Sequence, residues 1–121
     1  MNRITLLGEP RSTGSIYKIQ TKGMFATTYV TKAGKDLKAS YQKQAKEQWK
    51  NNLILGEVRM EMFLWFGTKR RCDIDNFNKL AFDALTGIVW EDDSQVKILT
   101  IKKLYDKQNP RIELDITEIP A

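Results

Sequence analysis

The chain has 121 residues, enough for one domain with a single hydrophobic core over residues 1–121. Hydrophobic residues make up 41% of it, as in ordinary globular proteins, and no run of about 18 apolar residues predicts a membrane span. The N-terminus has no signal-peptide pattern and the single cysteine cannot form an internal disulfide, so we expect a cytoplasmic protein. The absence of histidine excludes a Ser-His-Asp triad and imidazole-bound zinc.

The net charge of +5 is unevenly distributed. Residues 1–56 carry ten Lys and Arg against three Asp and Glu, whereas residues 57–121 carry ten against twelve. A basic half suits a polyanionic partner such as nucleic acid, because side chains that neutralise phosphates release counterions. The same lysines are equally typical of a helix face that only keeps the protein soluble. Charge alone leaves both interpretations open.

The first half of the chain predicts a strand, a hairpin and a helix. Residues 4–8 are typical of a short strand. Residues 15–20 and 24–30 flank a Thr-Lys-Gly turn and are expected to pair within the long connection 10–32. From residue 33 to about 51, apolar side chains recur every four positions, which predicts a helix with a narrow buried stripe. The stripe consists of Ala33, Leu37, Tyr41, Ala45 and Trp49.

The second half predicts a buried strand, a short helix and two further strands. Apolar residues alternate over 58–66, and over 76–86 their spacing is helical, with Gly87 placed to end the helix. Residues 95–105 and 111–119 are typical of strands, and a Gln-Asn-Pro stretch between them predicts a hairpin turn. The expected fold class is α+β. A mixed sheet would carry two main helices mostly on one face, in the order β, hairpin, α, β, α, β, β.

Two aspartates separated by one residue follow a run of three basic residues. In an extended segment Asp73 and Asp75 point the same way, roughly 6.6 Å apart. Carboxylates so placed can bracket one or two hard cations, and Mg²⁺ is often held by one or two carboxylates together with water and phosphate oxygens. The segment therefore predicts a divalent-metal site.

A second acidic cluster follows the helix. Because the chain from Gly87 to Asp93 spans at most about 23 Å and the helix is roughly 16 Å long, a turn at the glycine can bring the cluster back to Asp75. The residues do not decide between Asp92 and Asp93 as the one that approaches. Lys79 lies one helical turn beyond the first cluster, where it can steer a phosphate or stabilise developing charge.

Each acidic cluster also has a plainer explanation. Asp75 is well placed as a helix N-cap, and acidic residues are favoured in a first helical turn. The second cluster is compatible with a polar turn. A cap needs only one carboxylate, however, and a turn needs no Glu-Asp-Asp run. Taken together, the two clusters therefore support a metal-dependent phosphodiesterase site as well as they support these structural roles.

The order R-R-C-D-I-D-N-F-N-K-L-A-F-D-A-L, followed by W-E-D-D-S-Q-V, resembles the RusA family of Holliday-junction resolvases over residues 69–97. The C-terminal L-x-I-T-E segment fits the same family. The resemblance implies a homodimer that recognises four-way DNA junctions by their shape. It also implies an endodeoxyribonuclease that uses Mg²⁺, or Mn²⁺ as a substitute, to nick two opposing strands in DNA recombination and repair.

The resemblance also assigns roles by position. The implied metal ligands are Asp73, Asp75, Asp92 and Asp93, and the implied catalytic residues are Asp73, Asp75, Lys79 and Asp93. The implied DNA contacts are Lys69, Arg70, Arg71 and Asn76. Basic side chains would bring the phosphate backbone to the metal, and metal-bound water would attack it, because no histidine is present to act as a base. A two-fold protein would match a two-fold junction.

Two other functions are compatible with the residues. One is a non-catalytic basic module that binds RNA or single strands, with Phe25, Tyr29 and Trp65 as stacking groups. The other is a different metal nuclease that cuts ordinary duplex. Cleavage of a four-way junction compared with linear duplex, with and without Mg²⁺, separates the three.

Overall fold

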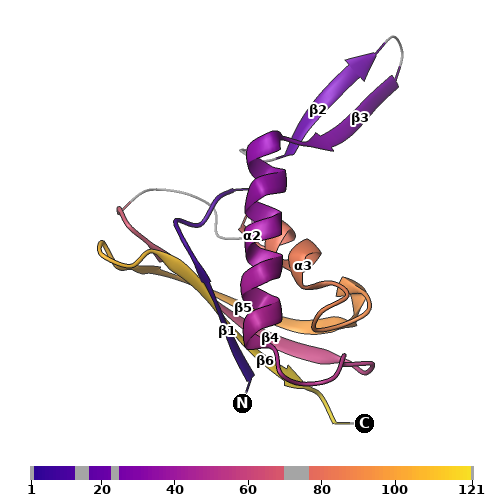
Figure 1. The fold of residues 1–121 in the computed structure, drawn as a ribbon, viewed down its shortest axis with the longest axis vertical. Coiled ribbons are helices and arrows are strands. Elements are labelled where there is room, and N and C mark those ends of the chain that lie inside the picture. Colours follow the sequence, from indigo (N-terminus) through magenta and orange to yellow (C-terminus); the bar gives the residue numbers. More distant parts are fainter. Residues whose placement is uncertain (1, 13–16, 23–24, 70–76, 121) are drawn as a thin grey trace.

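A computed structural model of the chain describes residues 2–12, 17–22, 25–69 and 77–120. Its elements follow the expected order (Figure 1). The strands are β1 (Asn2–Leu7), β2 (Tyr17–Lys22), β3 (Phe25–Val30), β4 (Val58–Phe66), β5 (Val96–Tyr105) and β6 (Arg111–Glu118). The helices are α2 (Lys32–Gln48) and α3 (Lys79–Leu85), with a short 3₁₀ turn, η2 (Asp93–Gln95), before β5.

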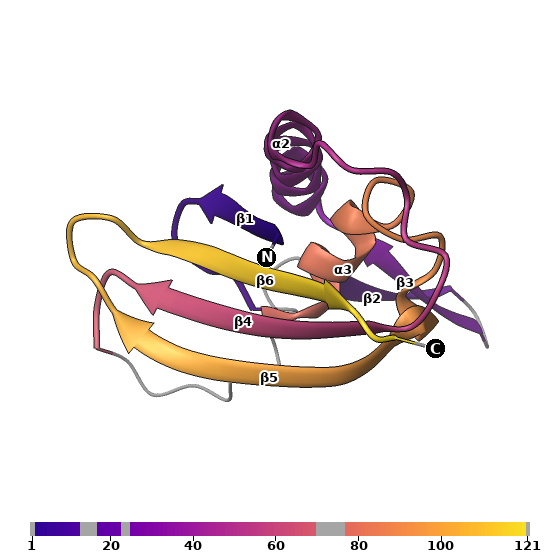
Figure 2. The same cartoon turned by 90° about the horizontal axis from the view of Figure 1, so that it is seen from below.

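The main sheet has four strands in the order β1, β6, β4, β5. β4 pairs parallel with β5 and antiparallel with β6, and β6 pairs antiparallel with β1, so the sheet is mixed. One row across it consists of Ile4, Leu114, Met62 and Ile101. Both helices lie over this apolar face (Figure 2). The predicted α+β class, with two main helices on one face of a mixed sheet, is confirmed.

The predicted hairpin between the last two strands is wrong, because β4 lies between β5 and β6. The connection 106–110 passes the end of β4, where the Asp106 N–H donates to the Phe66 carbonyl at 2.8 Å. The Asp106 carboxylate also accepts from the backbone N–H groups of Gln108 and Asn109, which turns the chain as expected. The pairing differs because β4, α3 and β5 form a crossover unit that places parallel strands side by side.

Helix α2 differs from the predicted stripe at its start. Tyr41, Ala45 and Trp49 are buried as predicted, but Ala33 is exposed and Gly34 is buried in its place. A helix has 3.6 residues per turn, so a strict four-residue repeat drifts about 40° around the axis at each step. Over the four steps from Trp49 back to Ala33, this drift carries the alanine off the buried face.

Two glutamines of α2 cover the outer edge of β1. Gln48 accepts from the Thr5 N–H at 2.7 Å and donates to the Thr5 carbonyl at 2.8 Å. Gln44 accepts from the Leu7 N–H at 2.8 Å. An edge strand leaves one row of backbone groups unpaired, and here a helix supplies the partners. These contacts fix the position of α2 along the sheet.

Helix α3 is shorter than the predicted helix over 76–86 and begins at Lys79. Its start is joined to the end of β4, because the Phe77 ring packs edge-on against the Phe66 ring, 5.2 Å between centroids. Gly87 follows the helix with a φ of +89°, which confirms its predicted role at the C-terminus. The apolar residues with helical spacing in the predicted range 76–86 are all buried: Phe77, Leu80, Ala81, Ala84 and Leu85.

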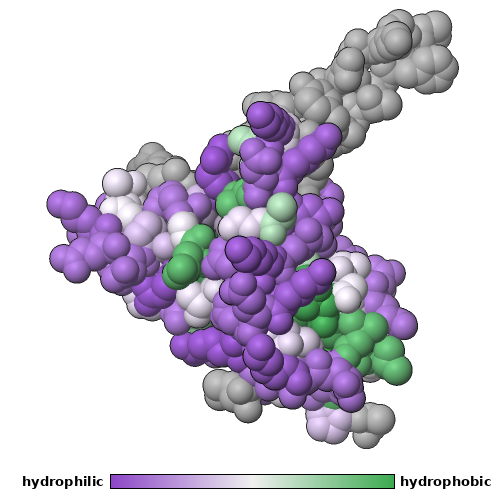
Figure 3. Space-filling view, in the orientation of Figure 1, coloured by the Kyte–Doolittle hydropathy of each residue, from purple (hydrophilic) through white to green (hydrophobic). Residues whose placement is uncertain are grey.

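The remaining features concern the surface. β2 and β3 pair antiparallel, which confirms the predicted hairpin, and the hairpin stands away from the sheet (Figure 1). The outer side of α2 is hydrophilic (Figure 3) and carries the exposed Lys35, Lys43 and Lys46. Within the described ranges, no helix is long and apolar enough to cross a membrane.

Candidate active site

The predicted site residues divide between described and undescribed parts of the chain. The first acidic cluster and its neighbours lie outside the described residues: Arg70, Arg71, Asp73, Asp75 and Asn76. Four other predicted site residues are described: Lys69, Lys79, Asp92 and Asp93. The geometry of the candidate site is therefore built from α3, from the turn after it and from the end of β4.

Lys79 is the first residue of α3, and its side chain is about half exposed. Its ammonium lies 3.9 Å from a carboxylate oxygen of Asp83, one helical turn further along. Because the apolar side of α3 faces the sheet, these two polar side chains occupy the other side of the helix. The helix thus presents a cation and an anion together at its surface.

A buried tryptophan returns the chain toward α3. After Gly87 the chain reverses, and the glycine N–H donates to the Trp90 carbonyl at 2.7 Å. The Trp90 side chain is fully buried, its ring packs edge-on against Phe82, and its indole N–H donates to the Thr86 hydroxyl. The residues directly after Trp90 are consequently held beside the helix.

The second acidic cluster forms a capped turn. The Asp92 carboxylate accepts from the Ser94 N–H at 3.3 Å, and the Gln95 side chain accepts from the Asp92 N–H at 2.9 Å, which completes a capping box. Hydrogen bonds to its carboxylate lower the pKa of Asp92; the backbone N–H of Ser94 has the largest effect, followed by the side chain of Asp93. The expected polar turn is thus present, with Asp92 as its N-cap and Asp93 in its first turn.

Gln95 also ties this turn to a distant segment. Its side-chain amide donates to the carbonyls of Ile54 and Gly56 at 2.8 and 2.9 Å, while its oxygen accepts from the backbone N–H groups of Glu91 and Asp92. Gln95 is a supporting residue that the predicted site did not include. A glutamine three residues after an aspartate is, however, the sequence signal of a capping box.

Asp93 lies where its negative charge interacts with α3. Burial is the largest cause that raises its pKa, and Asp92 and Asp83 raise it further, whereas Lys79 lowers it. The structure therefore brings Asp93 into the electrostatic range of the helix that carries the predicted catalytic lysine. Its approach to Asp75 stays a prediction, because Asp75 lies outside the described residues.

The donor chemistry at this position suits a hard cation. Asp93 is a carboxylate held next to other carboxylates, and a divalent cation would relieve the repulsion that raises its pKa. In the described part of the chain, however, no three His, Cys, Asp or Glu side chains lie close enough together to hold a metal ion. The other predicted ligands, Asp73 and Asp75, lie outside the described residues, so their approach to Asp93 stays a prediction.

Comparison with known proteins places the chain in a family. The family described as "Endodeoxyribonuclease RusA" matches residues 8–117, which cover both acidic clusters and three of the four strands of the main sheet, but not β1. The chain belongs to the RusA family. The resemblance seen in residues 69–97 is thereby confirmed.

Several curated proteins align with part of this RusA family member. The crossover junction endodeoxyribonuclease RusA of Escherichia coli strain K12 is 46% identical over 52 residues, which is 42% of this chain and 43% of that protein. The protein of the same name from Enterobacteria phage 82 is 44% identical over the same shares of both chains. The uncharacterized protein YqaN of Bacillus subtilis is 43% identical over 49 residues, 40% of this chain and 34% of that protein. The aligned part thus spans less than half of each relative.

Proposed function

We propose that this RusA family member is a structure-selective endodeoxyribonuclease that resolves four-way DNA junctions by paired cleavage in DNA recombination and repair. The observation that carries the proposal is the return of Asp93 to the side of α3 that bears Lys79. A polar turn with no function would not need a second carboxylate next to the one that caps it. The family match and the names of the relatives support junction DNA as the substrate.

The proposed site combines both acidic clusters. Asp73, Asp75 and Asp93 would hold Mg²⁺ or Mn²⁺, with Asp92 adjacent, and the metal would supply an activated water and stabilise the leaving oxygen. Lys79 would contact the phosphate, and its half-exposed ammonium beside Asp83 can turn toward a stronger anion. Asp92 would orient the turn that carries Asp93, since its carboxylate already caps that turn.

The other parts of the proposal concern assembly and location. Lys69, Arg70, Arg71 and Asn76 would contact the DNA backbone, and a homodimer would supply one cut on each of two opposing strands. One endonuclease domain over residues 1–121 is supported by a single hydrophobic core among the described residues. A cytoplasmic location is supported by the single cysteine.

The first experiment compares cleavage of a synthetic four-way junction with that of linear duplex, each with and without Mg²⁺. We expect Mg²⁺-dependent nicks in opposing strands of the junction only. Asp75→Asn and Asp93→Asn should abolish cleavage and leave junction binding intact, while Asp36→Asn, an exposed carboxylate of α2, serves as the matched control. Cutting of linear duplex at the same rate would show that the protein is a general nuclease instead. Binding of the junction without any cutting would show that it is a non-catalytic binding module.

A further inference from the structure

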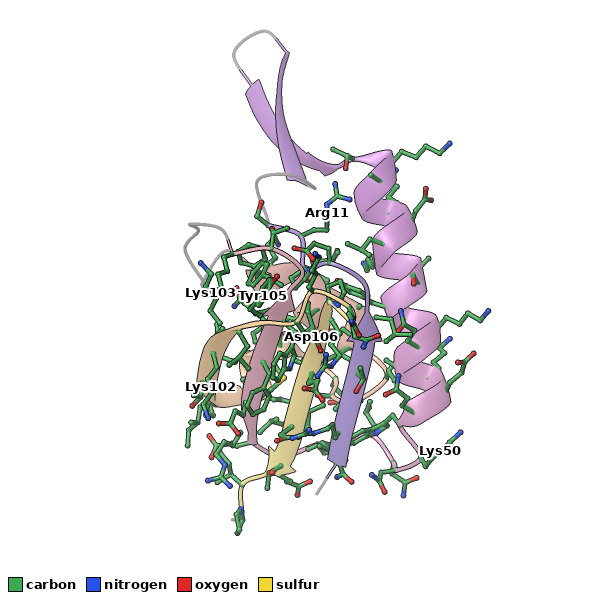
Figure 4. All side chains as sticks on the ribbon, turned by 90° about the vertical axis from the view of Figure 1, so that its left-hand side faces the viewer. Arg11, Lys50, Lys102, Lys103, Tyr105 and Asp106 are labelled. Atoms are coloured by element: carbon green, nitrogen blue, oxygen red, sulfur yellow. The ribbon has the colours of Figure 1, made fainter. Side chains whose placement is uncertain are left out.

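A stripe of lysines runs along the outer side of α2. At about 100° per residue, four lysines of this helix fall within an arc of about 80°, on the side away from the buried Tyr41 and Ala45. All four are exposed, and Figure 3 shows this side of the helix as hydrophilic. We call them the lysine stripe: Lys32, Lys35, Lys43 and Lys46. Lys50, just beyond the end of the helix, also points away from the sheet (Figure 4).

The lysine stripe consists of two pairs with the same internal spacing. Lys32 and Lys35 are three residues apart, and the second pair, Lys43 and Lys46, repeats the first eleven residues later. Eleven residues are almost three whole turns of a helix, so the two pairs face the same way and lie roughly 16 Å apart along its axis. Between them the stripe carries only the small, exposed side chain of Ala39.

The lysine stripe is held in a fixed place on the fold. At the start of α2, the Thr31 hydroxyl accepts from the Gly34 N–H at 3.1 Å and caps the helix. Near its end, Gln48 is bonded to both backbone groups of Thr5. Because both helices lie over one face of the sheet (Figure 2), a ligand on the stripe would be on the same side of the sheet as α3 and its predicted catalytic lysine.

The charges of the lysine stripe do not stabilise the helix that carries them. Lysines three residues apart repel each other, and α2 begins with Lys32 and has no acidic residue in its first turn, where the helix dipole disfavours cations. Each pair has a carboxylate one turn beyond its first lysine, at Asp36 and Glu47. Among the described residues, however, none of the four ammonium groups forms an ion pair. A phosphate backbone along the stripe would supply the opposite charge.

We propose that the lysine stripe binds a duplex arm of the junction, with α2 bridging one groove so that each pair of lysines contacts the backbone of a different strand. The major groove of B-DNA is about 12 Å wide between its two backbones, and pairs roughly 16 Å apart match the phosphate groups on its two sides. Ala39 faces the groove between them. The ligand is the sugar–phosphate backbone, so the contact is independent of base sequence. The inference rests on the proposed function and names the surface on which an arm of the substrate lies.

A plainer role for exposed lysines is solubility, which depends on net charge and is served equally well by lysines elsewhere on the surface. Lys102 and Lys107 therefore offer the matched control, because both are exposed and their loss removes the same charge as the loss of one pair. Lys102 lies on the sheet face opposite the helices, where it pairs with Glu61 at 3.0 Å, and Lys107 lies in the connection between β5 and β6. Solubility would make the control equivalent to the stripe, whereas a DNA contact would not.

The first test measures junction binding without divalent metal, at salt concentrations from about 50 to 200 mM. It compares the unmodified chain with three double variants: Lys32→Gln with Lys35→Gln, Lys43→Gln with Lys46→Gln, and the control Lys102→Gln with Lys107→Gln. For each stripe variant we expect the slope of log affinity against log salt to become shallower by about 1.8, which is roughly a twelvefold smaller loss over this range. The control should keep the slope of the unmodified chain. Equal slopes in all four proteins, or the same change in the control, would overturn the inference.

Thermal unfolding of the same variants separates binding from stability. Glutamine forms helices about as well as lysine does, and its introduction removes repelling charges, so Tm should stay the same or rise in both stripe variants. A fall in Tm together with the loss of binding would show that the lysines act on the fold, and it would overturn the inference.

Ethylation of single phosphates tests the bridged groove. For the unmodified chain, the phosphates whose ethylation weakens binding should form two groups on an arm, one on each strand across a groove. Each stripe variant should lose one group, and the two variants should lose different groups. Loss of the same group in both variants, or of neither, would overturn the bridging. Junction binding with the expected patterns but no cleavage by the unmodified chain would count against the proposed function alone. Cleavage of junctions with unaltered binding by both stripe variants would count against the lysine stripe alone.

Discussion

Gln95 offers the sharpest test of how the second acidic cluster is held. Its side chain makes four hydrogen bonds. The side-chain oxygen accepts from the backbone N–H groups of Glu91 and Asp92, and the side-chain nitrogen donates to the carbonyls of Ile54 and Gly56. Gln95→Ala removes all four at once. The turn would then lose its attachment to the segment before β4, and the neighbouring Asp93 would no longer be fixed beside α3.

The expected loss of stability follows from the exposure of the four partners. The carbonyl of Ile54 is partly buried, so the loss of its donor costs about 1 kcal/mol, whereas the three exposed groups regain water and cost about 0.5 kcal/mol each. Gln95→Ala should therefore lower the free energy of unfolding by about 2–3 kcal/mol. For a domain of this size, that corresponds to a fall in Tm of roughly 6–12 °C.

Urea denaturation and junction cleavage measure the two consequences separately. Cleavage below the new Tm should fall far more than the folded fraction does, because a displaced Asp93 no longer completes the proposed metal site. A change in unfolding free energy of less than about 0.5 kcal/mol, with normal cleavage, would refute the reasoning.

Gln95→Glu is the matched variant for this prediction. It keeps the two acceptor contacts with Glu91 and Asp92 but turns a carboxylate toward the carbonyls of Ile54 and Gly56. That environment raises the folded-state pKa of the introduced carboxyl group, so the variant should be least stable above this pKa. The variant should regain stability as the pH falls through this raised pKa, because the protonated carboxyl group can donate one hydrogen bond.

Two further predictions address other parts of the fold. Arg3 donates to both carboxylate oxygens of Asp115, and this contact is the largest cause that lowers the pKa of Asp115, so Arg3→Met should raise that pKa toward its ordinary value of about 3.9. The stabilisation by the pair is complete above the ordinary pKa and is lost as the pH falls through the lowered one. An unchanged Asp115 titration by carbon NMR in Arg3→Met would contradict this. Gly87→Ala should cost about 1–2 kcal/mol in urea denaturation, because φ is +89° while no atom lies within 4 Å of the added Cβ. Gly56→Ala, with only ordinary contacts to its Cβ and no positive φ, should be close to neutral, and equal losses in both variants would exclude backbone strain as the cause.

Local patterns in the sequence were sufficient to predict most of the elements. The alternation of apolar residues in β4 and their helical spacing in α3 are patterns that extend over only a few residues. The apolar side chains of both patterns are buried, so each pattern identified the side that meets the core. The positive φ at Gly87 was predictable for the same reason, since a helix end needs a residue that tolerates it. Ala33 shows the limit of such patterns, because a repeat of four drifts around the helix and only packing shows where the buried face ends.

The sequence also determined the family and the chemistry on which the proposal depends. The Asp-x-Asp spacing, Lys79 and the Trp-Glu-Asp-Asp turn are short-range features, and the residues alone make them recognisable as those of the RusA family. The absence of histidine likewise narrowed the kinds of catalysis from composition alone. These conclusions follow from the residue types and their spacing in the sequence. They do not depend on how the chain folds between the motifs.

Tertiary structure decided everything that depends on contacts between distant segments. The short link between β5 and β6 predicted a hairpin, yet β4 lies between them, because pairing partners are chosen by burial of the whole sheet. The distinction between Asp92 in the cap and Asp93 beside α3 likewise required the fold. The contact between the Lys69 ammonium and the Tyr105 ring also joins residues more than thirty positions apart. No local pattern encodes such contacts, since they arise only when the hydrophobic faces of separate elements are buried together.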